Sequence, residues 1–261
     1  MGLFDFITGG KGDKALVKHA ARARNKDAQS VDRFASLEAL ASSTGDKDLR
    51  SSAVIGLLGR FGMRYDKLID DEQEKEYVFD QLRRLGPAIL PELEQHMKQA
   101  ESIAWHLKLL GEVAKPDERW PLLDRLCLDN DNNYTRDPSK KIQIIHFLGE
   151  QEDPRCGAAL VQYLEDVDEG VRFITVEGLV AHKIEAAKDP LITLLTNERE
   201  ESRRIKKRIV EGFADLGWDV RGSAAVEKHV ADLLPGSRID NHGRVRRADK
   251  DKPGTADKSA R

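Results

Sequence analysis

The chain has 261 residues, of which 39% are hydrophobic, 6% aromatic and 34% charged. This composition is poor in apolar residues for a thick globular core, and no stretch approaches the about 20 apolar residues that a membrane-spanning helix needs. The formal net charge of -3 is uneven, because residues 1–26 and 236–261 each carry about +4 and the residues between them about -11. The first seven residues also lack the pattern of a secretory signal, so we expect a cytoplasmic protein.

Residues 1–12 are predicted to form a flexible or capping N-terminus. Their apolar segment Leu3–Ile7 could contact a membrane or a partner, but we favour its folding back over the exposed end of the first helices. The next elements are a short helix over 15–23 and a helix over 27–41 with apolar residues at helical spacing. A partner helix follows over 49–61, and 62–70 is a longer connection.

From residue 71 onward, helical hairpins follow one another regularly. Each has two runs of Leu, Val, Ile or Phe at helical spacing, separated by a turn that often holds Gly or Pro. Together with the earlier pair, these runs predict six hairpins behind one lead helix. The later runs pair as 78–85 with 90–97, 103–110 with 122–126, 142–148 with 160–164, 171–179 with 191–195, and 205–216 with 226–233.

The hairpins recur roughly every 30–40 residues, which is typical of stacked repeat proteins. Segments 141–149, 172–179 and 206–213 each begin with a cation and carry an apolar residue seven positions later. Because one hairpin has no way to bury its own apolar face, the units must stack. The sequence therefore predicts an all-α fold, an α-solenoid over residues 13–235, and residues 236–261 as a disordered basic tail.

The segment 166–173, Asp-Val-Asp-Glu-Gly-Val-Arg-Phe, followed by Val-Glu-Gly-Leu at 176–179, resembles the HEAT-like repeats of bacterial proteins, the group that includes the phycobilisome-lyase type. More widely, residues 27–218 are similar to small bacterial HEAT-repeat proteins, with recognisable words at 102–105, 134–138 and 140–143. The resemblance implies an armadillo-type superhelix and brings no particular activity with it.

Two groups of cations have a structural and a functional interpretation. Lys141, Arg172 and Lys206 share one repeat position, so they could form a cationic ladder, but we favour bonds to carboxylates and helix-end carbonyls that order the stack. The dense cluster 203–208 places like charges side by side on a helix. We expect local ion pairs, Glu200 with Arg204 and Lys207 with Glu211, rather than a bound anion, to offset this repulsion.

Catalysis, cofactor binding and metal binding have no support in the sequence. The loop 129–137 has the oxygen donors of a calcium loop at several positions, but Tyr134 stands where the turn needs Gly and Lys140 where a Glu should close the site. The three tryptophans are interpreted as packing residues. Cys127 and Cys156 are interpreted as buried thiols in a reducing compartment. An enzyme such as a lyase or glycosylase is the least favoured class.

The favoured hypothesis is a non-catalytic protein-binding scaffold that uses its concave face and long loops. Tyr and Arg are enriched where interface energy concentrates, which selects two residues of the long loop and three cations of the inner helices. The candidate partner-binding residues are Tyr134, Arg136, Lys140, Arg204 and Lys207. The alternative is a nucleic-acid binder that uses 203–208 and the tail cations Arg244, Arg246 and Arg247.

Overall fold

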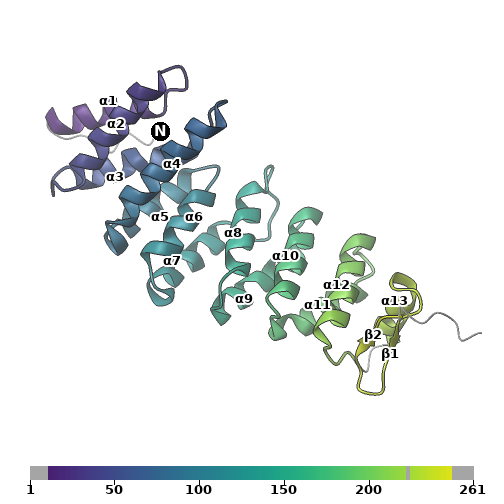
Figure 1. The fold of residues 1–261 in the computed structure, drawn as a ribbon. Coiled ribbons are helices and arrows are strands. Elements are labelled where there is room, and N and C mark those ends of the chain that lie inside the picture. The colour runs from purple at the N-terminus through teal and green to yellow at the C-terminus, as the bar shows by residue number, and fades with distance from the viewer. Residues whose placement is uncertain (1–10, 222–223, 249–261) are drawn as a thin grey trace, which may run out of the picture. The chain divides into compact units, whose positions relative to one another are not determined.

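The computed structural model describes residues 11–221 and 224–248, and this part of the chain is almost entirely helical (Figure 1). It contains thirteen α-helices, four short 3-10 helices labelled η, and one two-stranded hairpin. The fold class is therefore all-α, as predicted from the helical spacing of apolar residues. The N-terminal segment Leu3–Ile7, for which we predicted a capping role, lies outside the described residues.

The chain divides into two compact units, and the division falls within one helix. The first unit comprises residues 1–130 and 135–147, and the second comprises 131–134 and 148–261. The elements of the first unit are α1 (Lys11–Ala23), α2 (Ser30–Ser43), α3 (Arg50–Leu58), η1 (Gly59–Gly62), α4 (Leu68–Arg83), η2 (Gly86–Ile89), α5 (Leu90–Gln99), α6 (Ala104–Val113), α7 (Pro116–Asp129) and most of α8 (Ser139–Gly149).

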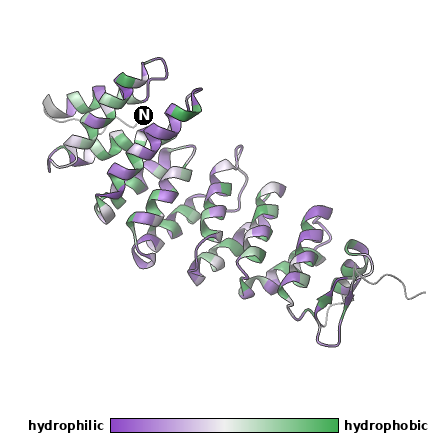
Figure 2. Ribbon diagram, viewed as in Figure 1, coloured by the Kyte–Doolittle hydropathy of each residue, from purple (hydrophilic) through white to green (hydrophobic). Residues whose placement is uncertain are grey.

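The second unit holds the later helices and the hairpin. Its elements are α9 (Pro154–Val161), η3 (Gln162–Glu165), α10 (Glu169–Ala181), η4 (Glu185–Ala187), α11 (Lys188–Thr196), α12 (Arg203–Leu216), α13 (Ala224–Leu233), β1 (Arg238–Ile239) and β2 (Val245–Arg246). Each apolar run predicted to be helical lies on a helix. Figure 2 shows hydrophobic and hydrophilic residues interspersed along these helices, as amphipathic packing requires.

Close packing in the first unit begins with α1, α2 and α3. Leu37 and Leu40 of α2 are fully buried, and Gly56 of α3 lies against Leu40. A Cβ at Gly56 would lie 2.8 Å from a methyl of Leu40 and 3.2 Å from Ala20. The glycine therefore lets α3 approach both neighbouring helices more closely than a larger residue would allow.

A cluster of five charged side chains is buried where α2, η1 and α4 meet. Arg60 pairs with Asp71 at 2.7 Å and with Glu74 at 2.8 Å. Glu74 also pairs with Arg33 at 2.9 Å, and Lys75 pairs with Asp71 at 2.7 Å. Because each charge has an opposite partner, the cluster avoids the large cost of a lone buried ion and fixes the three elements relative to one another.

Tyr65, in the connection before α4, ties this cluster to α1. Its hydroxyl donates to the carbonyl oxygen of Ala23 at 2.6 Å. The guanidinium carbons of Arg33 and Arg60 lie 4.2 and 4.1 Å from the centre of its ring, within cation–π distance. Burial raises the pKa of the Tyr65 hydroxyl above its usual value of 10.0, so the ring stays neutral.

Two buried histidines stack between α5 and α6. The rings of His96 and His106 have centroids 4.8 Å apart, and Nε2 of His106 lies 2.8 Å from Nδ1 of His96. Nδ1 of His106 has no hydrogen-bond partner within the described part of the chain. Burial lowers the pKa of His96 to about 4 and that of His106 well below 6.5, so both rings are neutral at pH 7.

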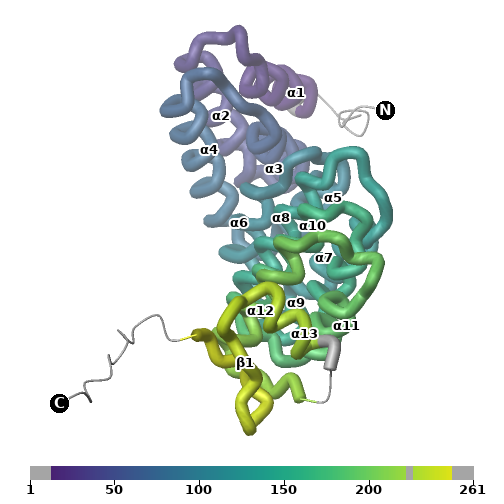
Figure 3. The backbone as a smooth tube through the Cα atoms, turned by 90° about the vertical axis from the view of Figure 1, so that its right-hand side faces the viewer, coloured from purple at the N-terminus to yellow at the C-terminus, as the bar shows by residue number. Residues whose placement is uncertain are grey.

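The second unit contains a hairpin where we predicted disorder. Strands β1 and β2 pair antiparallel, Ile239 opposite Val245, and β1 lies beside α13 (Figure 3). Gly243 makes the turn with a positive φ of 76°, and the Val220 amide donates to its carbonyl oxygen at 2.9 Å. Val245 of β2 is buried, and the hairpin lies within the segment 236–261 that the sequence predicts to be disordered. Residues 249–261 lie outside the described part of the chain.

Candidate functional site: a groove in the second unit

A groove of the second unit lies along α9, η3 and α11. It has a volume of about 640 Å³. Its lining combines apolar side chains with carboxylates and two arginines, but no His, Cys, Ser or Lys. The lining residues are Val161, Leu164, Glu165, Asp166, Arg172, Asp189, Pro190, Thr193, Leu194, Asn197, Arg199 and Glu200.

Local sequence signals produce both walls of this groove. Helix α9 begins at Pro154, after Asp153 has accepted a hydrogen bond from the Arg155 amide as N-cap. Its last turn tightens into η3, which ends at Asp166 in extended backbone. The opposite wall is α11, on which Leu191 is fully buried and Leu194 nearly so. The apolar floor is therefore the edge of the core between these helices.

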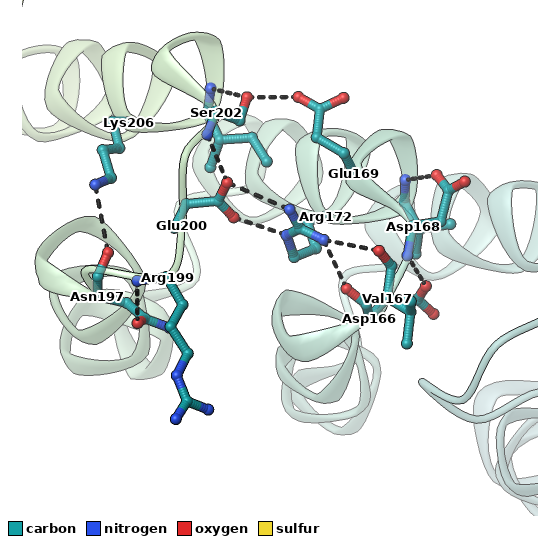
Figure 4. Close-up of polar contacts among 12 residues, drawn as sticks. Asp166, Val167, Asp168, Glu169, Arg172, Asn197, Arg199, Glu200, Ser202 and Lys206 are labelled. Atoms are coloured by element: carbon teal, nitrogen blue, oxygen red, sulfur yellow. Dashed lines mark hydrogen bonds and ion pairs between the residues drawn. The ribbon is translucent and has the colours of Figure 1, made fainter.

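Two of the lining residues, Arg172 and Glu200, form an ion pair (Figure 4). Nε of Arg172 donates to Glu200 at 2.7 Å and Nη2 donates at 3.3 Å. Nη1 donates to the carbonyl oxygens of Asp166 at 2.8 Å and Val167 at 3.1 Å. The arginine thus joins the end of η3 to the loop before α12, and its donors are used within the protein.

The same loop geometry occurs twice, before α10 and before α12. Asp168 caps α10 by accepting from the Val171 amide, and Ser202 caps α12 by accepting from the Ile205 amide. Two residues before each cap, an acidic side chain accepts from the amide of the capping residue, Asp166 in the first case and Glu200 in the second. The corresponding residues are 34 positions apart in the sequence.

Two of the three cations of the predicted ladder, Arg172 and Lys206, make the structural bonds that we favoured. Arg172 bonds a carboxylate and two carbonyl oxygens, as above. Lys206, its counterpart 34 positions later, donates to the carbonyl oxygen of Asn197 at the end of α11, at 3.3 Å. Lys141 is buried, with a side chain that is not free to bind a partner.

Three charged side chains that line the groove do not make such structural bonds. Glu165, Asp189 and Arg199 are exposed, and within the described residues their side chains form no ion pair. In Figure 4 the guanidinium of Arg199 points away from Glu200 and Arg172. An apolar floor flanked by two free carboxylates and one free guanidinium is suited to binding, because binding these groups breaks no internal bond.

The sequence-predicted loop residues Tyr134 and Arg136 are both exposed, Tyr134 to 75%. Tyr134 is assigned to the second unit and Arg136 to the first. The loop near Tyr134 is held by Asn132, which donates to the carbonyl oxygen of Gln162 at 3.4 Å. This contact ties the segment 131–134 to η3, one wall of the groove.

The three predicted cations are engaged in internal contacts. Lys140 is half-buried and donates to the carbonyl oxygens of Met97 at 2.6 Å and Lys98 at 3.2 Å, at the end of α5. Burial lowers the pKa of its ammonium. Lys207 pairs with Glu211 at 3.8 Å, as predicted.

The partner predicted for Arg204 is wrong. Its guanidinium donates from Nε to Glu169 at 2.7 Å and lies 4.5 Å from the ring centre of Phe173. Glu200 is unavailable because Arg172 holds it. The hydrogen bond from Arg204 lowers the pKa of the Glu169 carboxyl, so this pair carries both charges at neutral pH.

The cations proposed for the nucleic-acid alternative are also largely paired with carboxylates. Arg203 pairs with Asp232 and Arg208 with Glu177. In the hairpin region, Arg246 pairs with Asp240 at 2.8 Å and Arg247 with Asp215 at 2.7 Å. Pairing reduces the positive potential that a phosphate backbone would meet.

Two tryptophans pack as interpreted from the sequence. Trp105 stacks on Phe61 with centroids 5.6 Å apart and meets the edge of Phe79 at 6.0 Å, while Trp218 lies 6.1 Å from Phe213. Cys127 and Cys156 are buried, and neither forms a disulfide within the described residues. The groove residues Glu165, Asp189 and Arg199 were missed, because they have no motif of their own.

Comparisons with protein families, curated proteins and solved structures give no match to this chain. Within the described ranges, none of the helices has both the length and the apolar character needed to cross a bilayer. Function must therefore be inferred from the groove and from the arrangement of the helices themselves.

Proposed function

We propose that the protein is a non-catalytic scaffold or adaptor of the cytoplasm that binds a segment of a partner protein in the groove of its second unit. In this proposal the helical pairs form a HEAT-like α-solenoid, and the groove lies between the second helices of successive pairs. Two buried cysteines that form no disulfide within the described residues fit a reducing compartment.

The repeated local geometry supports stacking of the pairs. Arg172 and Lys206, the caps Asp168 and Ser202, and the glycines of α10 and α12 recur at one spacing. At Gly212 of α12 a Cβ would lie only 2.6 Å from Val180 of α10, so these two helices are in close contact. Identical contacts between successive pairs are the feature from which repeat arrays are built.

The free charges of the groove carry the functional proposal. Arg172 and Glu200 satisfy each other, whereas the carboxylates of Glu165 and Asp189 stay available beside Leu164 and Leu194. The groove lining has no nucleophile paired with a general base, which favours binding over chemistry. Two free carboxylates beside an apolar floor are complementary to a Leu-like side chain flanked by Lys or Arg.

Tyr134 is proposed as a further contact residue for the same partner. It is highly exposed, and its loop is tied through Asn132 to η3. Arg136 stays a proposed contact residue on the basis of its exposure alone. Lys140, Arg204 and Lys207 are proposed to act indirectly, by holding their helices in place through internal bonds.

The test uses three fluorescent synthetic peptides: a Leu core flanked by Arg, the same core flanked by Glu, and an Ala core flanked by Arg. Fluorescence anisotropy with the full chain should show binding of the Leu–Arg peptide, and at least about tenfold weaker binding of the other two. Thr193→Arg, an exposed substitution that fills the groove, should reduce binding by at least about tenfold.

Ala181→Arg is the matched control, because it adds the same charge at an exposed position on α10 that does not line the groove. It should leave peptide binding unchanged. Reversing the free carboxylates with Glu165→Lys and Asp189→Lys should shift the preference to the Glu-flanked peptide. Equal binding of all three peptides, or equal effects of Thr193→Arg and Ala181→Arg, would contradict the proposal.

A further inference from the structure

An exposed apolar cluster lies at the first turns of α2 and α4 in the first unit. Six large apolar side chains of the described residues are highly exposed, and three of them are here: Val31 at 69%, Leu68 at 62% and Ile69 at 74%. Helices α2 and α4 pack against each other. We call Val31, Leu68 and Ile69, with the groove between their helices, the tip patch.

The groove of the tip patch is lined by charged side chains of both signs, of which all but the paired Arg33 make up its rim. It has a volume of about 420 Å³ and runs between the segments 26–33 and 64–70. Within the described residues, none of its rim charges forms an ion pair. The cations are Lys26, Arg64 and Lys67, and the carboxylates are Asp27, Asp66 and Asp70.

The tip patch has a rigid support. Arg33 and Tyr65, which line its groove, belong to the buried ionic cluster beneath it. Arg33 donates to Glu74 and, at 2.6 Å, to the carbonyl oxygen of Ala28, which lines the groove itself. A preorganised surface loses less conformational freedom on binding, which favours association.

We propose that the tip patch binds the tip patch of a second copy of this chain, related by two-fold symmetry. A symmetric interface places the same surface on both partners, so it must be self-complementary. Three unpaired cations and three unpaired carboxylates in the groove, beside three exposed apolar side chains, meet this requirement, whereas a partner of one charge sign would face three like charges. The proposal concerns a surface separate from the groove of the second unit.

Self-association is measured by sedimentation velocity over about 1 μM to about 1 mM protein. The wild type should show a reversible monomer–dimer equilibrium that weakens as salt is raised, since the rim charges are exposed. Ile69→Glu should weaken dimerisation by at least about tenfold. Leu128→Glu, at a residue 69% exposed on α7, is the matched control and should not change it.

Charge reversal tests self-complementarity directly. Lys26→Glu with Lys67→Glu makes the rim acidic, and Asp27→Lys with Asp66→Lys makes it basic. Each double variant alone should stay monomeric, and an equal mixture of the two should form a heterodimer. Circular dichroism confirms that each is folded. A wild type that is monomeric at every concentration, or a mixture that does not associate, would overturn the proposal.

Discussion

Replacing Arg172 by Met tests whether the ion pair beside the groove holds successive helical pairs together. The side chains of Arg172 and Glu200 are 17% and 2% exposed, so removing the arginine leaves a carboxylate almost without water. Losing one partner of a buried pair costs about 3–5 kcal/mol, and the partial exposure of Arg172 lowers our expectation to about 2–4 kcal/mol. The two carbonyl oxygens that accept from Arg172 also lose their donor.

The assay is urea unfolding of Arg172→Met, Glu200→Gln and the double variant, with amide hydrogen exchange in α10 and α12. Because the double variant leaves no lone buried charge, its cost should be smaller than the sum of the single costs by about 2 kcal/mol. Arg221→Met, which breaks an exposed pair with Asp219, should cost less than about 0.5 kcal/mol. A cost for Arg172→Met below about 1 kcal/mol, or additive single costs, would refute the reasoning.

Three further predictions concern packing and protonation. Gly212→Ala should destabilise the protein by about 1–2 kcal/mol, because its Cβ would lie 2.6 Å from Val180. Gly178→Ala, whose Cβ would lie 3.9 Å from a Leu160 methyl, should be neutral or stabilising, and equal shifts of the two variants in urea midpoint would contradict this. The pKa of His96 is about 4 in the folded state and 6.5 in the unfolded state, so the unfolded state binds more protons between these pH values. About 3 kcal/mol of stability that is present above pH 6.5 should therefore be lost as the pH falls to about 4. A His96→Gln variant should show a shallower loss in acid titrations of the urea midpoint, and an unchanged slope would exclude this histidine as the cause. Lys140→Met should lower stability by about 1 kcal/mol without changing peptide binding, because its donors serve α5; weaker binding at unchanged stability would return Lys140 to the partner site.

The helices were predictable because their signals are local. Apolar residues at helical spacing, Pro in first turns and Gly at ends place each helix, as at Pro154 of α9 and Gly217 after α12. The hairpin around Val245 was missed because two-residue strands carry no periodic pattern and one buried valine supplies the burial. Its order depends on contacts with residues far away in sequence, such as the amide of Val220.

The candidate site was less predictable, because ion pairs are chosen in three dimensions. Helical spacing pointed to Glu200 for Arg204, but the fold brings Glu169 to Arg204 and gives Glu200 to Arg172. The free charges of the groove are defined only after such pairs are known. The repeat spacing was the available signal, since Asp166 and Glu200 precede equivalent helix caps.

The most direct test of the groove is methyl NMR of the full chain during titration with the Leu–Arg peptide. Shift changes should centre on Val161, Leu164 and Leu194 of the groove, and they should disappear in Thr193→Arg but persist in Ala181→Arg. Changes that leave these three methyl-bearing residues untouched, while the peptide binds, would contradict the account.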